Sequence, residues 1–60
     1  MTTWTPAEIK DLRVKMGLSQ PEFAQLVGAS VTTVSRWENG HQSPSRITRK
    51  LLDTIAERAD

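Results

Sequence analysis

The chain has 60 residues, a net charge of +1 and no cysteine. This length indicates one small domain that buries only about 60% of its unfolded surface, and the lack of cysteine excludes disulfides and thiolate chemistry. A single histidine cannot build a metal site alone, and because no apolar run or signal-peptide pattern is present we expect a cytoplasmic protein and no membrane partner.

Charge is unevenly distributed along the chain. Residues 30–50 carry four cations and one anion, a net charge of +3, whereas residues 1–29 are balanced and residues 51–60 carry −2. A basic excess of this kind is a modest footprint for a polyanionic partner. Solvated protein surfaces often carry a similar excess, so charge alone does not decide the partner.

The first predicted helix spans residues 6–16. Thr5 can cap it, and Glu8, three residues later, completes a capping box. Trp4 and Ile9 have the spacing of a hydrophobic staple around this cap. These signals fix the start of the helix.

The second predicted helix spans residues 20–27 and begins in the same way. Ser19 and Glu22 have the spacing of a second capping box. Gly28 then ends the helix after about two turns, because glycine readily adopts the left-handed conformation that closes helices.

The third element, residues 31–39, gives conflicting signals. Residues 31–34 are all β-branched, which by propensity favours a strand. A strand would need a partner run of alternating residues, and the sequence offers none. Because Ser30 is a good N-cap and Asn39-Gly40 a good helix end, we predict a helix.

The last predicted helix spans residues 44–58. Ser43 can cap it, with Ser45 as the alternative, and Pro44 suits the first turn. Its apolar face consists of Ile47, Leu51, Leu52 and Ile55. The sequence therefore predicts an all-α fold of four helices.

The second and third helices have the spacing of a helix-turn-helix over residues 20–39. Two helices joined by so short a turn cross at about 90–120°. Such a crossing needs a small residue at the close approach, a glycine in the turn and apolar residues on the inner face. These requirements are met by Ala24, Gly28, Val34 and Trp37.

The segment LSQPEFAQLVGASVTTVSRWENG resembles the lambda-repressor-like (Cro/repressor, XRE-type) DNA-binding domains. The Ser-Gln opening, the Phe-Ala pair, the glycine turn and the final Trp-Glu-Asn-Gly carry the resemblance, which spans about residues 7–55. It implies a small lambda-repressor-like bundle of four helices, or five as in many such domains, forming one DNA-binding domain over residues 1–60. It also implies that helix 31–39 lies in the major groove of double-stranded DNA.

Short, stiff side chains suit the first turn of such a recognition helix, because they lose little rotamer entropy on docking. We expect base contacts from Val31, Thr32, Ser35 and Arg36. The methyl groups can meet a thymine methyl, and the guanidinium can bind guanine O6 and N7 together. The alternatives are that Arg36 is a solvated cation and that Val31 merely begins the helix.

Phosphate contacts should set the register on DNA. In the family the glutamine that opens the second helix clamps the backbone, and helix N-termini favour anions. His41 is first of all a loop residue that can lie near a phosphate, and for Arg46 a purely solvated role is equally open. The expected phosphate contacts are Gln20, Ser30, Thr33, Asn39, His41, Ser43 and Arg46.

The resemblance also implies a salt bridge between Arg13 on the first helix and Glu38 at the end of the third. Removing one partner would strand the other charge, at a cost of about 3–5 kcal/mol if it is buried. The alternative is that the two are unrelated surface charges.

A homodimer is expected because one recognition helix contacts few bases, and two-fold proteins bind palindromes with half-sites about 10 bp apart. The four apolar residues of the last helix cannot all face inward. Leu52, together with Ile55, is the predicted subunit contact, and a core position for Leu52 is equally open.

No catalytic constellation, metal cluster or phosphate-binding glycine loop is present in the sequence. We therefore expect a sequence-specific transcriptional regulator that is not an enzyme and needs no cofactor or small-molecule substrate. Compact members of the family serve as phage regulators, antitoxins and regulators beside anti-CRISPR genes, so a dimeric repressor of a bacterial or phage mobile-element operon is the leading hypothesis. The alternative is a helix-turn-helix module whose main partner is a protein.

Overall fold

The computed structural model describes residues 4–59, which form four α-helices and no strand. The predicted all-α bundle is confirmed, and within these residues it has four helices, not five. Residues 1–3 and 60 of the predicted domain lie outside the described part. The helices are α1 (Pro6–Lys15), α2 (Gln20–Val27), α3 (Val31–Glu38) and α4 (Arg46–Ala59).

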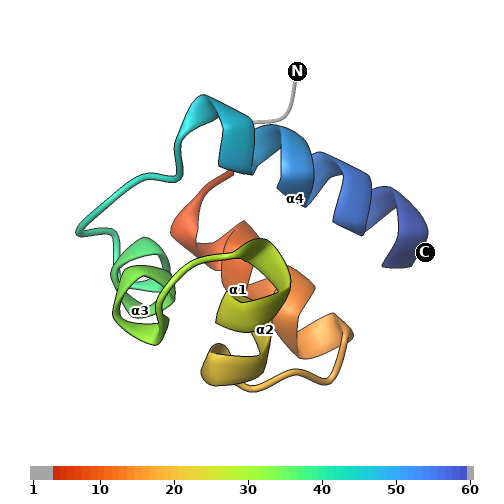
Figure 1. The fold of residues 1–60 in the computed structure, drawn as a ribbon, viewed down its shortest axis with the longest axis horizontal. Helices are drawn as coiled ribbons and strands as arrows, with labels where there is room; N and C mark the ends of the chain where they lie inside the picture. The colour runs from red at the N-terminus through yellow and green to blue at the C-terminus, as the bar shows by residue number, and fades with distance from the viewer. Residues whose placement is uncertain (1–3, 60) are drawn as a thin grey trace.

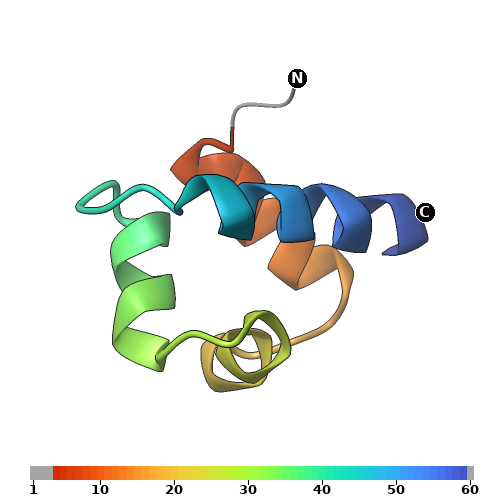
Figure 2. The same ribbon diagram turned by 45° about the horizontal axis from the view of Figure 1, so that its top comes forward.

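The helices are arranged so that α3 lies at one end of the molecule (Figure 1). The turned view shows α4 running across the top of the bundle (Figure 2). None of the described helices is long and apolar enough to cross a bilayer.

Both predicted capping boxes are present at the starts of α1 and α2. The backbone N–H of Glu8 donates to Thr5 Oγ1 at 3.2 Å, and Thr5 N–H donates to Glu8 Oε1 at 3.0 Å. Ser19 and Glu22 repeat this exchange at 3.3 and 2.8 Å. Because each box satisfies helix N–H groups that have no intrahelical acceptor, it fixes where the helix starts.

The turn between α2 and α3 explains how a β-branched segment becomes a helix. Gly28 has φ +73°, the left-handed conformation that glycine adopts without strain. Ala29 N–H donates to Ala24 O at 2.9 Å, which closes α2. Ser30 then accepts from Thr33 N–H at 3.1 Å and begins α3, so the helical prediction is confirmed and the strand is excluded.

A single core lies where the four helices meet. Phe23 and Val34 have no exposed surface, and burying each side chain of this kind stabilises the fold by about 1.5–3 kcal/mol. Every helix contributes to this core, so α3 is held from behind by α1 and α2. The buried residues are Ile9, Leu12, Phe23, Ala24, Val27, Val34, Trp37 and Leu52.

The last helix begins two residues later than predicted. Thr48 N–H donates to Ser45 Oγ at 3.3 Å and Arg49 N–H donates to Ser45 O at 2.8 Å, so Ser45 occupies the cap position. Pro44 is buried in the preceding loop and lies outside the helix. The predicted cap at Ser43 is therefore wrong, and the alternative is confirmed.

The orientation of α4 corrects one predicted contact. Leu52 is fully buried in the core of the single chain, so it cannot be a subunit contact, and its alternative role as a core residue is confirmed. Ile55 is partly buried against the same core. The apolar side chains that α4 exposes are Ile47, at 82%, and Leu51, at 38%.

A tertiary hydrogen bond ties the segment before α1 to α4. The indole N–H of Trp4 donates to Asp53 Oδ1 at 2.8 Å, which joins residues 49 positions apart. Trp4 also packs against the core. This contact helps to hold α4 across the bundle.

Candidate nucleic-acid interface

The outer side of α3 carries exposed side chains. Val34 and Trp37 point into the core, whereas Val31, Thr32 and Arg36 are exposed. Among residues 4–59, no element lies over this outer side in either ribbon view (Figures 1 and 2). Thr32 and Arg36 are one turn apart, so their side chains share one face.

Ser35 differs from the other predicted base contacts because it is half-buried. Its hydroxyl accepts a hydrogen bond of 3.3 Å from Asn39 Nδ2, and its carbonyl accepts one of 2.8 Å from the same amide. Ser35 and Asn39 therefore stabilise the last turn of α3. Base and phosphate contacts from these two residues stay predictions.

Two predicted phosphate contacts meet at the first turn of α3. The hydroxyls of Ser30 and Thr33 lie 2.9 Å apart in a hydrogen bond, and Ser30 also caps the helix. These groups therefore have a structural role in the free protein. The other predicted contacts in this region, His41, Ser43 and Arg46, are exposed between α3 and the start of α4.

Arg13 and Glu38 form the predicted salt bridge behind α3. Arg13 Nε donates to Glu38 Oε2 at 2.7 Å, and Nη2 donates to Oε1 at 3.1 Å, a two-pronged geometry. The two side chains are only 14% and 5% exposed. Arg13 also donates to Leu18 O at 3.0 Å, so the guanidinium links α1, the following turn and the end of α3.

Gln20 joins this network, which sequence reasoning did not predict. Its Nε2 donates to Glu38 Oε1 at 3.1 Å, so the residue expected to clamp a phosphate is also bonded to the end of α3. An amide has two donor hydrogens and a carbonyl acceptor. A phosphate contact therefore needs the second hydrogen or a rotation of the side chain, and it stays a prediction.

The network controls the charge state of Glu38. Burial alone would raise the pKa of this carboxyl, but hydrogen bonds from Arg13 and Gln20, with the charges of Arg13 and Lys10, outweigh it and lower the pKa. The hydrogen bond to Glu38 in turn raises the pKa of Arg13, although burial opposes it. Glu38 is therefore an anion at neutral pH, and it holds the end of α3 against α1 and α2.

Cations near this surface are not equivalent. Arg36, Arg46 and Lys50 are exposed, whereas half-buried Arg49 donates through Nη1 to Pro44 O at 3.2 Å. Arg49 thus supports the loop before α4, a role that the sequence did not reveal. Within residues 4–59, no group of three or more His, Cys, Asp or Glu side chains could hold a metal ion.

Comparisons with known proteins agree with this geometry. A helix-turn-helix family profile (HTH_3) matches residues 9–57. The uncharacterized HTH-type transcriptional regulator YiaG of Escherichia coli K12 is 38% identical over 53 residues, which cover 88% of this chain and 55% of that protein. No solved structure matches the chain.

Two further relatives match 83% and 65% of the chain. Antitoxin PezA of Streptococcus pneumoniae serotype 4 is 42% identical over 50 residues, 83% of this chain and 30% of that protein. The propionyl-CoA carboxylase regulator of Cereibacter sphaeroides is 44% identical over 39 residues, 65% of this chain and 8% of that protein. The chain therefore spans about half of the regulator YiaG and less of the other two.

Proposed function

The chain belongs to the helix-turn-helix family HTH_3, and we propose that it regulates transcription by binding a specific sequence of double-stranded DNA. The observation that carries this proposal is the outer face of α3, where Thr32 and Arg36 stand exposed one turn apart. A helix fits the major groove of B-DNA, where each base pair presents a distinct pattern of donors and acceptors.

Each side of α3 has a separate task in this proposal. On the outer side, Arg36 donates to guanine O6 and N7, and the methyls of Val31 and Thr32 pack against a thymine methyl. On the inner side, the Arg13–Glu38 pair keeps the helix at a fixed angle to α1. A fixed angle matters because hydrogen bonds to base edges are short and directional, and a recognition helix that changes its orientation relative to the domain would lose them.

Phosphate binding supplies affinity and register in this proposal. The N-terminus of α2 offers Gln20, and the exposed loop before α4 offers His41, Ser43 and Arg46 on the other side of α3. These groups would contact phosphates on either side of the groove that α3 enters. Contacts of this kind are largely independent of base sequence.

Two copies would bind a palindromic operator with half-sites about 10 bp apart. A protein so bound acts most simply as a repressor that occludes a promoter, including its own in a mobile-element operon. This dimer is supported by the small number of bases that one short helix can contact.

A second candidate is a module whose main partner is a protein. It is favoured by one observation, the 42% identity to antitoxin PezA over 83% of the chain. Salt dependence separates the two candidates, because neutralising phosphates makes log K fall steeply with log salt. A protein-only module would bind no duplex at any salt concentration.

The experiment begins with selection of bound duplexes from a random pool, followed by titration of the selected site at several salt concentrations. Arg36→Ala should weaken binding to the selected site by about 1–3 kcal/mol of binding free energy, and binding to random DNA by less. Val14→Ala is the matched control, since Val14 is 59% exposed on α1, outside the helix-turn-helix. Equal losses on both duplexes would show that Arg36 contacts phosphate only, and no enrichment of any sequence would refute the proposal.

A further inference from the structure

One face of α4 is exposed, apolar along its centre and charged at its edge. Ile47 and Leu51 lie one turn apart on this face and are 82% and 38% exposed. Thr54 and Arg58 continue the same line toward the C-terminal end of the helix, and both are exposed. The opposite face carries Leu52 into the core, so the exposed line is not needed to hold α4 on the bundle.

The other end of the same helix borders a hollow of about 240 Å³. Its lining combines α4 with α2 and the end of α1, namely Met16, Leu26, Ile55, Arg58 and Ala59. Pockets for drug-sized ligands hold about 300–1,000 Å³, so this hollow is better suited to a side chain.

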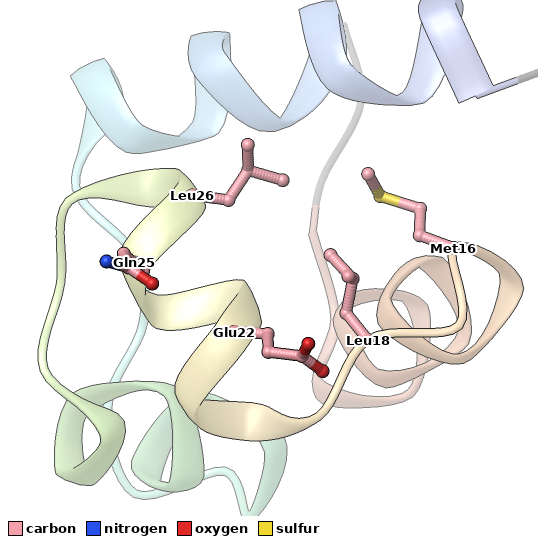
Figure 3. Close-up of a pocket in the computed structure, with 5 residues that line it drawn as sticks. All are labelled: Met16, Leu18, Glu22, Gln25 and Leu26. Atoms are coloured by element: carbon pink, nitrogen blue, oxygen red, sulfur yellow. The ribbon is translucent and has the colours of Figure 1, made fainter.

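A second hollow continues this apolar surface between α1 and α2. Figure 3 shows Leu26, Leu18 and Met16 pointing into the space beneath α4, with the carboxylate of Glu22 at its edge. Leu26 lines both hollows and is 47% exposed. Apolar surface thus extends from the C-terminal half of α4 toward α2.

We propose that a second copy of this chain packs its α4 antiparallel against this α4, with Ile47 of each copy entering the hollow beside Ile55 and Arg58 of the other. The proposal rests on the dimer of the proposed function and identifies its interface. In this register Leu51 of one copy faces Thr54 of its partner. The aliphatic part of Arg58 covers the inserted isoleucine, as long cationic side chains commonly do.

Charge order along α4 selects this antiparallel arrangement. Lys50 and Glu57 are exposed and lie two turns apart along the same edge of the face. An antiparallel pair places Lys50 of each copy near Glu57 of the other, whereas a parallel pair in register would place like charges side by side. Flanking charges of this kind determine the orientation of paired helices.

Symmetry makes the contact self-limiting. Ile47 and the hollow lie at opposite ends of α4. A two-fold axis near the middle of α4 therefore lets Ile47 of each copy enter the hollow of the other. The contact closes after two copies and leaves α3 of each copy uncovered, as the proposed function requires.

The first test measures the dissociation constant of the dimer without DNA, by sedimentation of the chain at concentrations up to about 1 mM. A Kd of about 1 mM corresponds to a binding free energy of about −4 kcal/mol. Ile47→Asp should raise the dimer Kd about tenfold or more, and Val14→Asp, on an exposed apolar residue of α1, should not. Lys50→Glu should weaken the dimer, and Lys50→Glu combined with Glu57→Lys should restore it. An Ile47→Asp variant that dimerises like the wild type would overturn the interface.

Cross-linking provides a second readout, because the chain has no cysteine of its own. A mixture of Leu51→Cys and Thr54→Cys chains should form mixed disulfide dimers under oxidation, and Val14→Cys chains should form none with either. Equal cross-linking of all pairs would also overturn the interface.

The outcomes separate this inference from the proposed function. A chain that stays monomeric to about 1 mM but binds a selected duplex would overturn the interface and leave DNA binding intact. A chain that dimerises as described but binds no duplex at any salt concentration would confirm the interface and refute the DNA-binding proposal.

Discussion

Replacing Arg13 with alanine should remove two of the three side-chain hydrogen bonds that Glu38 accepts, leaving only the bond from Gln20. The stranded carboxylate is 5% exposed, and a buried charge that loses its partner costs about 3–5 kcal/mol. Because Arg13 itself is 14% exposed, the pair lies at the edge of the core and we expect a loss of about 3 kcal/mol. A domain of this size has a total stability of about 3–9 kcal/mol, so a large part of it would be lost.

Urea unfolding followed by tryptophan fluorescence measures this loss. Trp37, which precedes Glu38 in the sequence, is only 4% exposed in the folded core and becomes exposed to solvent on unfolding. Arg13→Ala should lower the urea midpoint without changing the slope. Val14→Ala, the next position on α1, is the control and should unfold as the wild type does. Arg13→Ala combined with Glu38→Ala should cost less than the sum of the single changes, because neither charge is then stranded.

Two results would refute this reasoning. An Arg13→Ala chain with the wild-type midpoint would show that Glu38 regains full solvation when its partner is removed. Strictly additive single and double variants would show that the two side chains do not stabilise each other, whatever their distance.

Three further predictions concern the charge of Glu38, the turn at Gly28 and the core residue Leu52. Because the pKa of Glu38 is lowered in the folded chain, its contribution is complete above the ordinary glutamate value of 4.5 and is lost as pH falls through the folded value. Urea titrations below pH 4.5 should therefore show a steeper loss of stability for the wild type than for Glu38→Gln. Gly28→Ala should cost about 1–2 kcal/mol from backbone strain alone, since no atom lies within 4 Å of the added methyl, and a loss above that would indicate a clash. Leu52→Ala should lower the free energy of unfolding by about 2–5 kcal/mol. Ile47→Ala should lower it by less than about 0.5 kcal/mol. Equal losses for the two variants would contradict the assigned orientation of α4.

The parts of the fold that could be predicted depend on contacts between near neighbours in the sequence. Thr5 with Glu8 and Ser19 with Glu22 exchange hydrogen bonds across three residues, so their spacing alone predicts where two helices begin. The left-handed turn at Gly28 is equally local. For α3, the cap residue Ser30, the Asn39-Gly40 end and the lack of a partner strand predicted a helix in spite of its β-branched start.

The parts that could not be predicted depend on how the helices pack. The sequence places Leu51 and Leu52 together on the expected apolar face of α4, but only the packing of α4 on the bundle shows that Leu52 enters the core and Leu51 does not. The bond from Gln20 to Glu38 joins residues 18 positions apart, and no pattern in the sequence indicates it. For the start of α4, the sequence favoured Ser43 over Ser45 as the cap, and only the hydrogen bonds that Ser45 accepts identify it as the cap.

The hydrogen bond from Trp4 to Asp53 can form only late in the synthesis of the chain, because its two residues are 49 positions apart. Chains emerge from the ribosome N-terminus first, at about 5–20 residues per second. The residues of α3 are therefore synthesised before Leu52 can fill the core or Asp53 can accept from Trp4. Residues 31–38 thus wait about a second for the packing of α4, and an eight-residue helix is only marginally stable until that packing forms.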